Sequence, residues 1–279
     1  MDREATAGRC CRQVRKSKLK DGSNEARLGV MKRYGQFCPV AKAAELLTER
    51  WTVLILRELT MGSTRYNDIR RGVPLISPSV LAQRLKTLVE SGIVECAREQ
   101  SGRSREYKLT PAGEEIEPII QAVGIWGQRW VRNRMHEDDL DASLLMWDMR
   151  RSIRPEALPA KRTVIYFEFS DAKKGMRRWW VVVENGEADL CLQDPGHEVD
   201  LAVYTTLYCF TRIWMGDLSL ASARSSGEVR LEGEGKLKQT MTQWLGFSSF
   251  APVRAPGQAS GPRQISGSVS VELPKLVRH

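Results

Sequence analysis

The chain has 279 residues, of which 42% are hydrophobic, and its formal net charge is +9. This length and apolar content allow two domains of ordinary size, each with its own core. The sequence has no apolar run of about 18 residues, which argues against a membrane span, and no apolar N-terminal region, which argues against a secretory signal. We therefore expect a cytoplasmic protein that has no membrane partner.

The positive charge is concentrated in the first half of the chain. Residues 1–33 carry a net charge of +6, residues 34–135 carry +4 and residues 136–279 carry −1. Such a distribution is typical of a protein whose first domain contacts nucleic acid. Residues 1–33 also lack apolar periodicity, so we expect a disordered basic leader. Either Met31 is the true start instead of Met1, or the leader is an arm that binds phosphate.

Helical periodicity begins directly after the leader. Four segments are predicted to be helices: 38–47, 51–59, 65–71 and 76–92. The fourth has clear ends, because Ser77 can cap it, Pro78 suits the first helical position and Gly92 can end it. Two strand-like runs, 93–98 and 106–110, then surround a glycine-centred tip. This order of elements predicts a winged helix-turn-helix domain.

The helix 76–92 has two different faces. Leu81, Leu85 and Leu88 form an apolar stripe, whereas Ser79, Ala82, Gln83 and Lys86 lie opposite. A helix with such a polar face can enter the major groove of DNA, where Gln pairs with adenine and Lys or Arg with guanine or phosphate. The alternative is an ordinary solvated surface helix.

Five short motifs in this region closely resemble those of the HxlR-type regulators, a branch of the winged-helix transcription factors related to the MarR type. The motifs are Cys38-Pro-Val, Trp51-Thr-Val-Leu-Ile-Leu-Arg-Glu-Leu, Arg65-Tyr-Asn-Asp-Ile-Arg, Ile76-Ser-Pro-Ser-Val-Leu-Ala-Gln-Arg-Leu and Tyr107-Lys-Leu-Thr-Pro-Ala-Gly. The resemblance covers about residues 34–132 and implies a homodimer on a near-palindromic operator in double-stranded DNA. Ser79 departs from the family pattern, in which a basic residue is common, so the base preference does not carry over.

We therefore expect the DNA contacts to come from the fourth helix and the wing. Gln83 is predicted to read a base edge, with Ser79 and Lys86 beside it, and arginines are predicted to bind phosphate. The full set of candidate DNA-binding residues is Ser77, Ser79, Gln83, Arg84, Lys86, Arg103 and Arg105.

A further helix is predicted after the wing, with Thr110 as its cap and Pro111 at its first position. Apolar residues recur along it at three- and four-residue steps, from Ile116 and Ile119 onward. The local core is already provided by Leu46, Leu54, Leu56, Ile69, Leu81, Leu85 and Leu88. We therefore assign the later residues of this stripe to a dimer interface, which would match a palindromic operator. These residues are Ile120, Val123, Trp126 and Trp130.

An acidic segment at residues 136–141 interrupts the periodicity, and the domain boundary is predicted there. Residues 34–135 would then form the winged domain and residues 140–250 a second domain. Within the second, strand-like segments are followed by helices laid over one face, which predicts an α+β fold. The strands are expected at 163–169, 179–184, 188–192, 199–204 and 229–233, and the helices at 144–154, 207–215, 218–223 and 236–245. Residues 251–279 are predicted to be a disordered tail.

The second domain resembles the sterol-carrier-protein type-two fold in its order of elements and in two short motifs. These are Trp214-x-Gly-Asp-Leu-Ser-Leu and Ser226-Gly-Glu-Val-Arg-Leu-Glu-Gly. The resemblance implies an apolar tunnel, with Phe210, Trp214 and Trp244 as candidate ligand-binding residues. The alternative is a packed domain without a ligand, because aromatic residues fill cores more often than they line cavities.

Catalytic and metal-binding signatures are absent from the sequence. The six cysteines form no CxxC pair and have no His at ligand spacing, so neither a metal site nor a cofactor is predicted. We find no nucleophile elbow, phosphate loop or HExxH motif, and therefore expect no enzyme. Cys38 is the redox candidate, because it precedes Pro39 at a helix start and a cysteine here serves some members of the resembling family as a sensor. The alternative is a half-buried structural thiol.

Together these patterns predict a dimeric, DNA-binding transcriptional regulator whose second domain binds a small apolar ligand. Two alternatives remain open. The chain could be a lipid carrier that uses the winged domain as a dimer scaffold, or a regulator that senses oxidation through Cys38.

Overall fold

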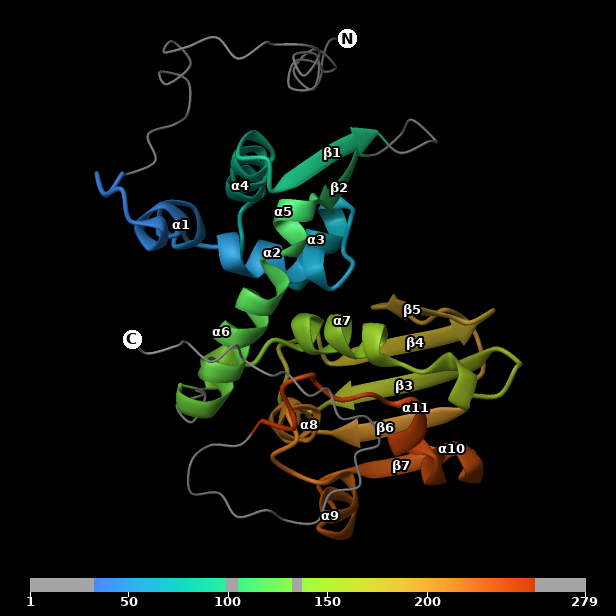
Figure 1. Cartoon of the computed structure of the whole chain (residues 1–279). Coiled ribbons are helices and arrows are strands. Elements are labelled where there is room, and N and C mark those ends of the chain that lie inside the picture. Colours follow the sequence, from blue (N-terminus) through green and yellow to red (C-terminus); the bar gives the residue numbers. More distant parts are fainter. Residues whose placement is uncertain (1–32, 99–104, 132–136, 254–279) are drawn as a thin grey trace. The chain divides into compact units, whose positions relative to one another are not determined.

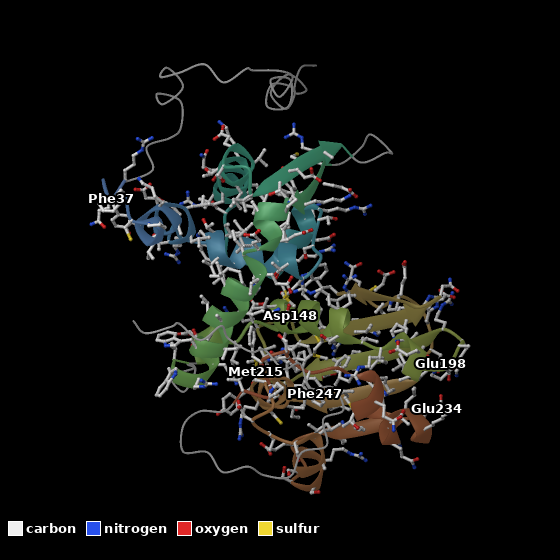
Figure 2. The ribbon with its side chains drawn as sticks, viewed as in Figure 1. Phe37, Asp148, Glu198, Met215, Glu234 and Phe247 are labelled. Atoms are coloured by element: carbon white, nitrogen blue, oxygen red, sulfur yellow. The ribbon has the colours of Figure 1, made fainter. Side chains whose placement is uncertain are left out.

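A computed structural model describes residues 33–98, 105–131 and 137–253 (Figure 1). The chain divides into two compact units between Arg50 and Trp51. In the first unit, α1 (Pro39–Leu47) starts after Cys38, with proline at its first position. None of its residues is fully buried. The prediction that Leu46 belongs to the core is therefore wrong. Phe37, labelled in Figure 2, is 99% exposed.

The second unit begins with the predicted helix-turn-helix and wing. Its first elements are α2 (Thr52–Thr60), α3 (Tyr66–Gly72), α4 (Pro78–Glu90), β1 (Val94–Arg98) and β2 (Arg105–Leu109). The two strands pair antiparallel, and a bridge between Arg65 and Glu106 joins the start of α3 to the hairpin. The signals at both ends of α4 are confirmed. The Ser77 side chain accepts a hydrogen bond from the Val80 amide at 3.3 Å, and Gly92 has a φ of 74°.

The core of this region comes from the apolar stripes of three helices. Its fully buried members include Ile55, Leu56, Ile69, Leu81, Leu85 and Leu88. The prediction was wrong for Leu54, which is 38% exposed. The buried face of α2 carries Thr52, Ile55, Leu56 and Leu59, and Leu54 falls outside that stripe at helical spacing.

The helix predicted to start at Thr110 is interrupted. The structure has a short α5 (Pro111–Glu114) and then α6 (Glu117–Trp130). Pro118 explains the break, because it has no amide hydrogen and its ring would clash with the carbonyl of residue 114 in a continuous helix. Thr110 caps α5 as predicted, accepting a hydrogen bond from the Gly113 amide at 3.2 Å.

A five-stranded sheet forms the centre of the C-terminal region. Its strands are β3 (Thr163–Phe169), β4 (Arg178–Glu184), β5 (Glu187–Cys191), β6 (Leu201–Thr205) and β7 (Arg230–Gly233). The order is β5-β4-β3-β6-β7, in which β3 and β6 are parallel and the other neighbours antiparallel. Asn185 and Gly186 join β4 to β5 with positive φ angles of 54° and 78°, as the Asn-Gly signal predicts.

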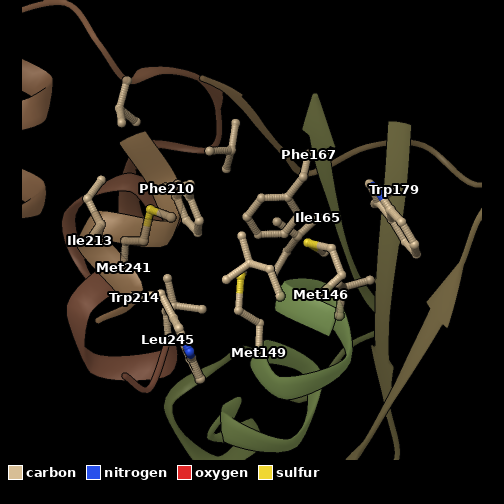
Figure 3. Close-up of a cluster of buried hydrophobic side chains, with 14 of the residues drawn as sticks. Met146, Met149, Ile165, Phe167, Trp179, Phe210, Ile213, Trp214, Met241 and Leu245 are labelled. Carbon is tan, nitrogen blue, oxygen red and sulfur yellow. The ribbon is translucent and has the colours of Figure 1, made fainter. Parts of the chain in front are cut away.

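Helices pack on one face of this sheet. They are α7 (Ala142–Ser152), α8 (Leu207–Trp214), α9 (Leu220–Ser225), α10 (Gly235–Gln239) and α11 (Met241–Trp244). Ile165 and Phe167 of β3 pack against Met146 and Met149 of α7 and Phe210 of α8 in one buried cluster (Figure 3). The predicted helix 236–245 is divided between α10 and α11 at Thr240. The α+β fold class is confirmed, whereas the sterol-carrier resemblance stays a prediction.

The predicted leader and tail fall almost wholly outside the described residues. The predicted boundary at 136–141 also stays a prediction. In the structure, the elements on both sides of this segment belong to the second unit. Among the described residues, no helix is long and apolar enough to cross a membrane.

Candidate nucleic-acid interface

The polar face of α4 is exposed as the sequence predicts. Ser79, Gln83 and Lys86 all face solvent, while Leu81, Leu85 and Leu88 on the other side are at most 1% exposed. Anchoring by three buried leucines fixes the rotation of the helix about its own axis. The face presented outward is therefore set by the core.

The start of α4 is held in place by its neighbours. Tyr66 of α3 donates a hydrogen bond from its hydroxyl to the carbonyl oxygen of Pro78 at 2.8 Å. The hydroxyl oxygens of Ser77 and Ser79 lie 3.2 Å apart. Ser77 thus has a structural role as the cap, and a DNA contact from it stays a prediction. Tyr66 was missed because a half-buried tyrosine in a short helix has no distinctive spacing.

The lysine and arginines that are candidate DNA contacts differ in how freely their side chains can move. The Lys86 Nζ lies 3.6 Å from a Glu90 carboxylate oxygen, and both side chains are well exposed, so the pair is weak and Lys86 can leave it. Arg84 is half-buried and interacts with other residues. Arg105 starts β2 opposite Arg98, and its side chain hydrogen-bonds that of Tyr107. Arg103 lies outside the described residues.

An apolar stripe on α6 is exposed to solvent. Ile119, Val123, Trp126 and Trp130 are 48%, 51%, 60% and 58% exposed. Ile120 was predicted to belong to this stripe but is only 7% exposed, because it lies about 100° around the helix from Ile119 and faces the protein interior. The exposed stripe of α6 therefore consists of Ile119, Val123, Trp126 and Trp130, and its role as a dimer interface stays a prediction.

A buried carboxylate links the helix-turn-helix to the C-terminal region. Glu58 of α2 is 0% exposed and accepts hydrogen bonds from Arg57 at 2.8 Å and from Arg151 of α7 at 2.9 Å. Ser63 and the Trp147 indole donate to the same carboxylate at 3.1 and 3.3 Å. Gly72 allows this arrangement, since a Cβ there would collide with the carboxylate. α2 and α7 are therefore joined by a buried cluster in which Arg57 and Arg151 balance the negative charge of Glu58.

The charges in this cluster shift one another's pKa. Burial raises the pKa of Glu58, but Arg57 and Arg151 outweigh burial and hold it below its usual value. Asp148, labelled on α7 in Figure 2, is also bonded by Arg151, yet burial is dominant there and raises its pKa. Glu58 thus stays ionised near neutral pH. Sequence analysis missed this residue, although a glutamate on the buried stripe of α2 was a signal that it needed buried partners.

The candidate ligand residues of the C-terminal region are buried in its core. Phe210 and Trp244 are 0% exposed and Trp214 is 7% exposed, and all three belong to the packed apolar cluster. The Trp244 indole donates to the Leu237 carbonyl oxygen at 3.1 Å. Their role in ligand binding stays a prediction.

Cys38 is a free, half-buried thiol at the cap position of α1. Its redox role stays a prediction as well. Within the described ranges, no group of three or more His, Cys, Asp or Glu side chains could hold a metal ion.

Comparison with known proteins finds relatives for the helix-turn-helix region. The sequence model of the HxlR-like helix-turn-helix family matches residues 46–135. The uncharacterized HTH-type transcriptional regulator YvaP of Bacillus subtilis (strain 168) is 35% identical over 99 residues, which are 34% of this chain and 91% of YvaP. The uncharacterized HTH-type transcriptional regulator YtfH of Escherichia coli (strain K12) is 34% identical, over 33% of this chain and 75% of YtfH.

Solved structures of transcriptional regulators resemble part of this chain. The reduced form of the transcriptional regulator YodB from B. subtilis is 30% identical, covers 36% of this chain and 100% of its own, and has a TM-score of 0.32. The redox regulator HypR in its reduced form is 29% identical, covers 33% of this chain and 91% of its own, and has a TM-score of 0.31.

Proposed function

Because the chain belongs to the HxlR-like helix-turn-helix family, we propose that it is a sequence-specific transcriptional regulator that binds a near-palindromic operator as a dimer. Its relatives are HTH-type transcriptional regulators and not enzymes. The observation that carries the proposal is the polar face of α4, which is exposed, capped by Ser77 and anchored by three buried leucines.

The polar face of α4 suits the major groove. Gln83 can pair through its amide with both N6 and N7 of adenine, and Ser79 and Lys86 lie one turn to either side of it. Arg84, Arg103 and Arg105 supply phosphate contacts, which give affinity without reading sequence. Ser77 adds a hydroxyl at the N-terminus of the helix, where the backbone amides favour a phosphate.

The exposed stripe of α6 supports a dimer. Val123, Trp126 and Trp130 would be buried against the same residues of a second copy, because a two-fold axis brings one surface against itself. Ile119 belongs in this interface and Ile120 does not, given their exposures of 48% and 7%. Such symmetry places two α4 helices to read two half-sites of opposite orientation.

The regulator is proposed to respond to a small molecule bound by its C-terminal region. Phe210, Trp214 and Trp244 would take an apolar ligand only by rearranging a packed core, which costs free energy. A second candidate for the signal is oxidation of Cys38, since HypR, a relative of known structure, is a redox regulator. A carrier that used the helix-turn-helix only as a scaffold would not need the exposed polar face of α4.

Selection of bound sequences from a random pool of DNA duplexes tests the proposal. We expect enrichment of an inverted repeat whose half-sites are about 10 base pairs apart, centre to centre. A variant with both Gln83→Ala and Lys86→Ala should enrich a different or weaker motif. A pool that stays random after selection with the wild-type chain would contradict the proposal.

A further inference from the structure

A cavity of about 620 Å³ lies where α3 and the loop after it face α7 and β5. Asn67, Arg70, Arg71 and Pro74 line it from the helix-turn-helix side. Ser143, Trp147 and Arg150 of α7, Trp179 of β4 and residues 189–192 complete its wall. This volume is in the range that holds a small organic molecule. None of the candidate ligand residues taken from the sequence lines it.

The charge of the cavity wall favours an anion. Three arginines, Arg70, Arg71 and Arg150, line it together with one acidic residue, Asp189. Arg150 is half-buried, donates to the Ala188 carbonyl oxygen at 3.3 Å and has a buried Nε without an acceptor among the described residues. Burial lowers the pKa of Arg150; Asp68 and Asp189 oppose this effect, and repulsion with Arg151 and Arg71 adds to it. A carboxylate in the cavity could accept hydrogen bonds from the terminal nitrogens of these arginines.

The other part of the wall is formed mainly by apolar side chains. Trp147 and Trp179 are each 3% exposed, and their indole N–H groups are used elsewhere, by Glu58 and by the Met176 carbonyl oxygen. The parts of these rings that reach the cavity therefore offer only apolar or stacking contacts, and three arginines, Arg71, Arg150 and Arg151, already lie over the Trp147 ring. The guanidinium carbon of Arg150 lies 4.4 Å from the centre of the Trp147 ring. An aromatic ligand fits beside such a pair, because flat rings stack on both indole and guanidinium planes.

We propose that this cavity binds a small aromatic carboxylate. The carboxylate would be held by Arg150 together with Arg70 or Arg71, and the ring would lie against Trp147, Trp179 and the leucines of β5 and its end, Leu190 and Leu192. The arginine fork matches a carboxylate with two parallel hydrogen bonds, which a neutral ligand cannot form.

The position of the cavity gives such a ligand a route to DNA binding. α3 directly precedes α4, and Tyr66 at the start of α3 is bonded to Pro78 at the start of α4. A ligand that touches α3 on one side and α7 and β5 on the other changes operator affinity if it binds one arrangement of these elements better than another. This regulatory consequence rests on the proposed function, whereas the binding itself does not.

Isothermal titration of the full chain with naphthalene-1-carboxylate, in the absence of DNA, tests the proposal. Two comparison compounds are naphthalene-1-methanol, which keeps the ring but has no charge, and octanoate, which keeps the charge but has no ring. We expect saturable binding of the naphthoate and at least about tenfold weaker binding of both others. Comparable affinity for the alcohol or for octanoate would overturn the ligand class, and no saturable binding of the naphthoate would overturn the site.

Two variants connect binding to this cavity. Arg150→Gln removes the charge and should weaken binding of the naphthoate at least about tenfold, while Arg224→Gln, an exposed arginine outside the cavity wall, should leave it unchanged. Leu192→Trp is the second variant. Leu192 is 48% exposed, so the larger ring can fill the cavity entrance without disturbing the core, and binding should be lost while the circular dichroism spectrum stays that of the wild type.

Wild-type affinity in both Arg150→Gln and Leu192→Trp would place the ligand elsewhere and overturn the proposal. The two proposals also fail separately. A chain that binds the naphthoate but selects no DNA sequence contradicts only the proposed function. A chain that selects an operator but does not bind the naphthoate contradicts only the proposed cavity ligand.

Discussion

Replacement of Arg151 by methionine should destabilise the second unit strongly. The Arg151 side chain is 12% exposed and donates to Glu58 through both terminal nitrogens, at 2.9 and 3.3 Å. Methionine keeps much of the length and apolar volume of arginine but can donate no hydrogen bond. The substitution therefore removes the bond from Arg151 to Asp148 and leaves the Glu58 carboxylate buried with three donors: Arg57, Ser63 and Trp147.

The remaining donors set the size of the effect. Loss of one partner of a buried ion pair costs about 3–5 kcal/mol when the other charge is left uncompensated. Because Arg57 still neutralises Glu58, we expect a smaller loss, about 2–3 kcal/mol of unfolding free energy. In a folded unit of this size each kcal/mol lowers the melting temperature by about 2–4 °C, so a fall of about 5–10 °C should result.

Thermal and urea unfolding followed by circular dichroism measure this loss. Arg162→Met is the matched control, because Arg162 pairs with Glu184 on the surface, where both side chains are 43% exposed. An exposed pair contributes about 0–1 kcal/mol, so the control should melt close to the wild type. If Arg151→Met unfolds at the temperature of the control, the buried cluster does not join α2 to α7 energetically, and our account of it is wrong.

Three further predictions concern the exposed stripe of α6, the wing and the buried Glu58. Val123→Asp should give monomers in sedimentation and much weaker DNA binding, because the new carboxylate would be desolvated in a symmetric interface; a dimer would place the interface elsewhere. Arg103→Ala should weaken binding to operator and random DNA alike and reduce the salt slope by about one, as expected of a phosphate contact; a loss confined to the operator would contradict this. Glu58→Gln should make the free energy of unfolding depend less on pH in the acid range. The lowered pKa of Glu58 means that the unfolded state binds more protons than the folded state below pH 4.5, so wild-type stability falls there as the pH falls. An unchanged profile would show that Glu58 is not the group responsible.

Local signals in the sequence predicted the helix-turn-helix well. The ends of α4 follow from Ser77, Pro78 and Gly92, whose backbone preferences act within a few residues and need no distant partner. The turn at Asn185 and Gly186 was predictable for the same reason. The exposed polar face of α4 followed from the spacing of its leucines, so the candidate base-reading residue Gln83 could be placed correctly on the surface.

Features that depend on distant contacts could not be predicted in the same way. The periodicity of α6 does not tell which apolar residues face the protein's own core, and Ile120 was therefore assigned to the wrong side. Phe210 and Trp244 are aromatic whether they fill a core or line a tunnel, and only packing shows that they are buried. Two of the partners of Glu58, Trp147 and Arg151, lie about 90 positions further along the chain. No spacing rule connects residues that far apart.

The cavity illustrates the same limit. Its basic residues, Arg70 and Arg71 of α3 and Arg150 of α7, come from segments that lie far apart in the sequence. Only the packing of α7 and β5 next to α3 brings them around one space. The composition of the C-terminal region, which is nearly neutral, gives no sign of this local positive charge.

The central claim is that α4 reads DNA sequence, and the measurement that tests it most directly is a titration of wild type and Gln83→Ala against the selected operator and against random duplex of equal length. Gln243→Ala, a change of the same kind at an exposed position in the C-terminal region, is the control. We predict that Gln83→Ala loses about 1–3 kcal/mol of binding free energy on the operator and little on random DNA. Equal losses on the two duplexes, or none on either, would contradict the claim.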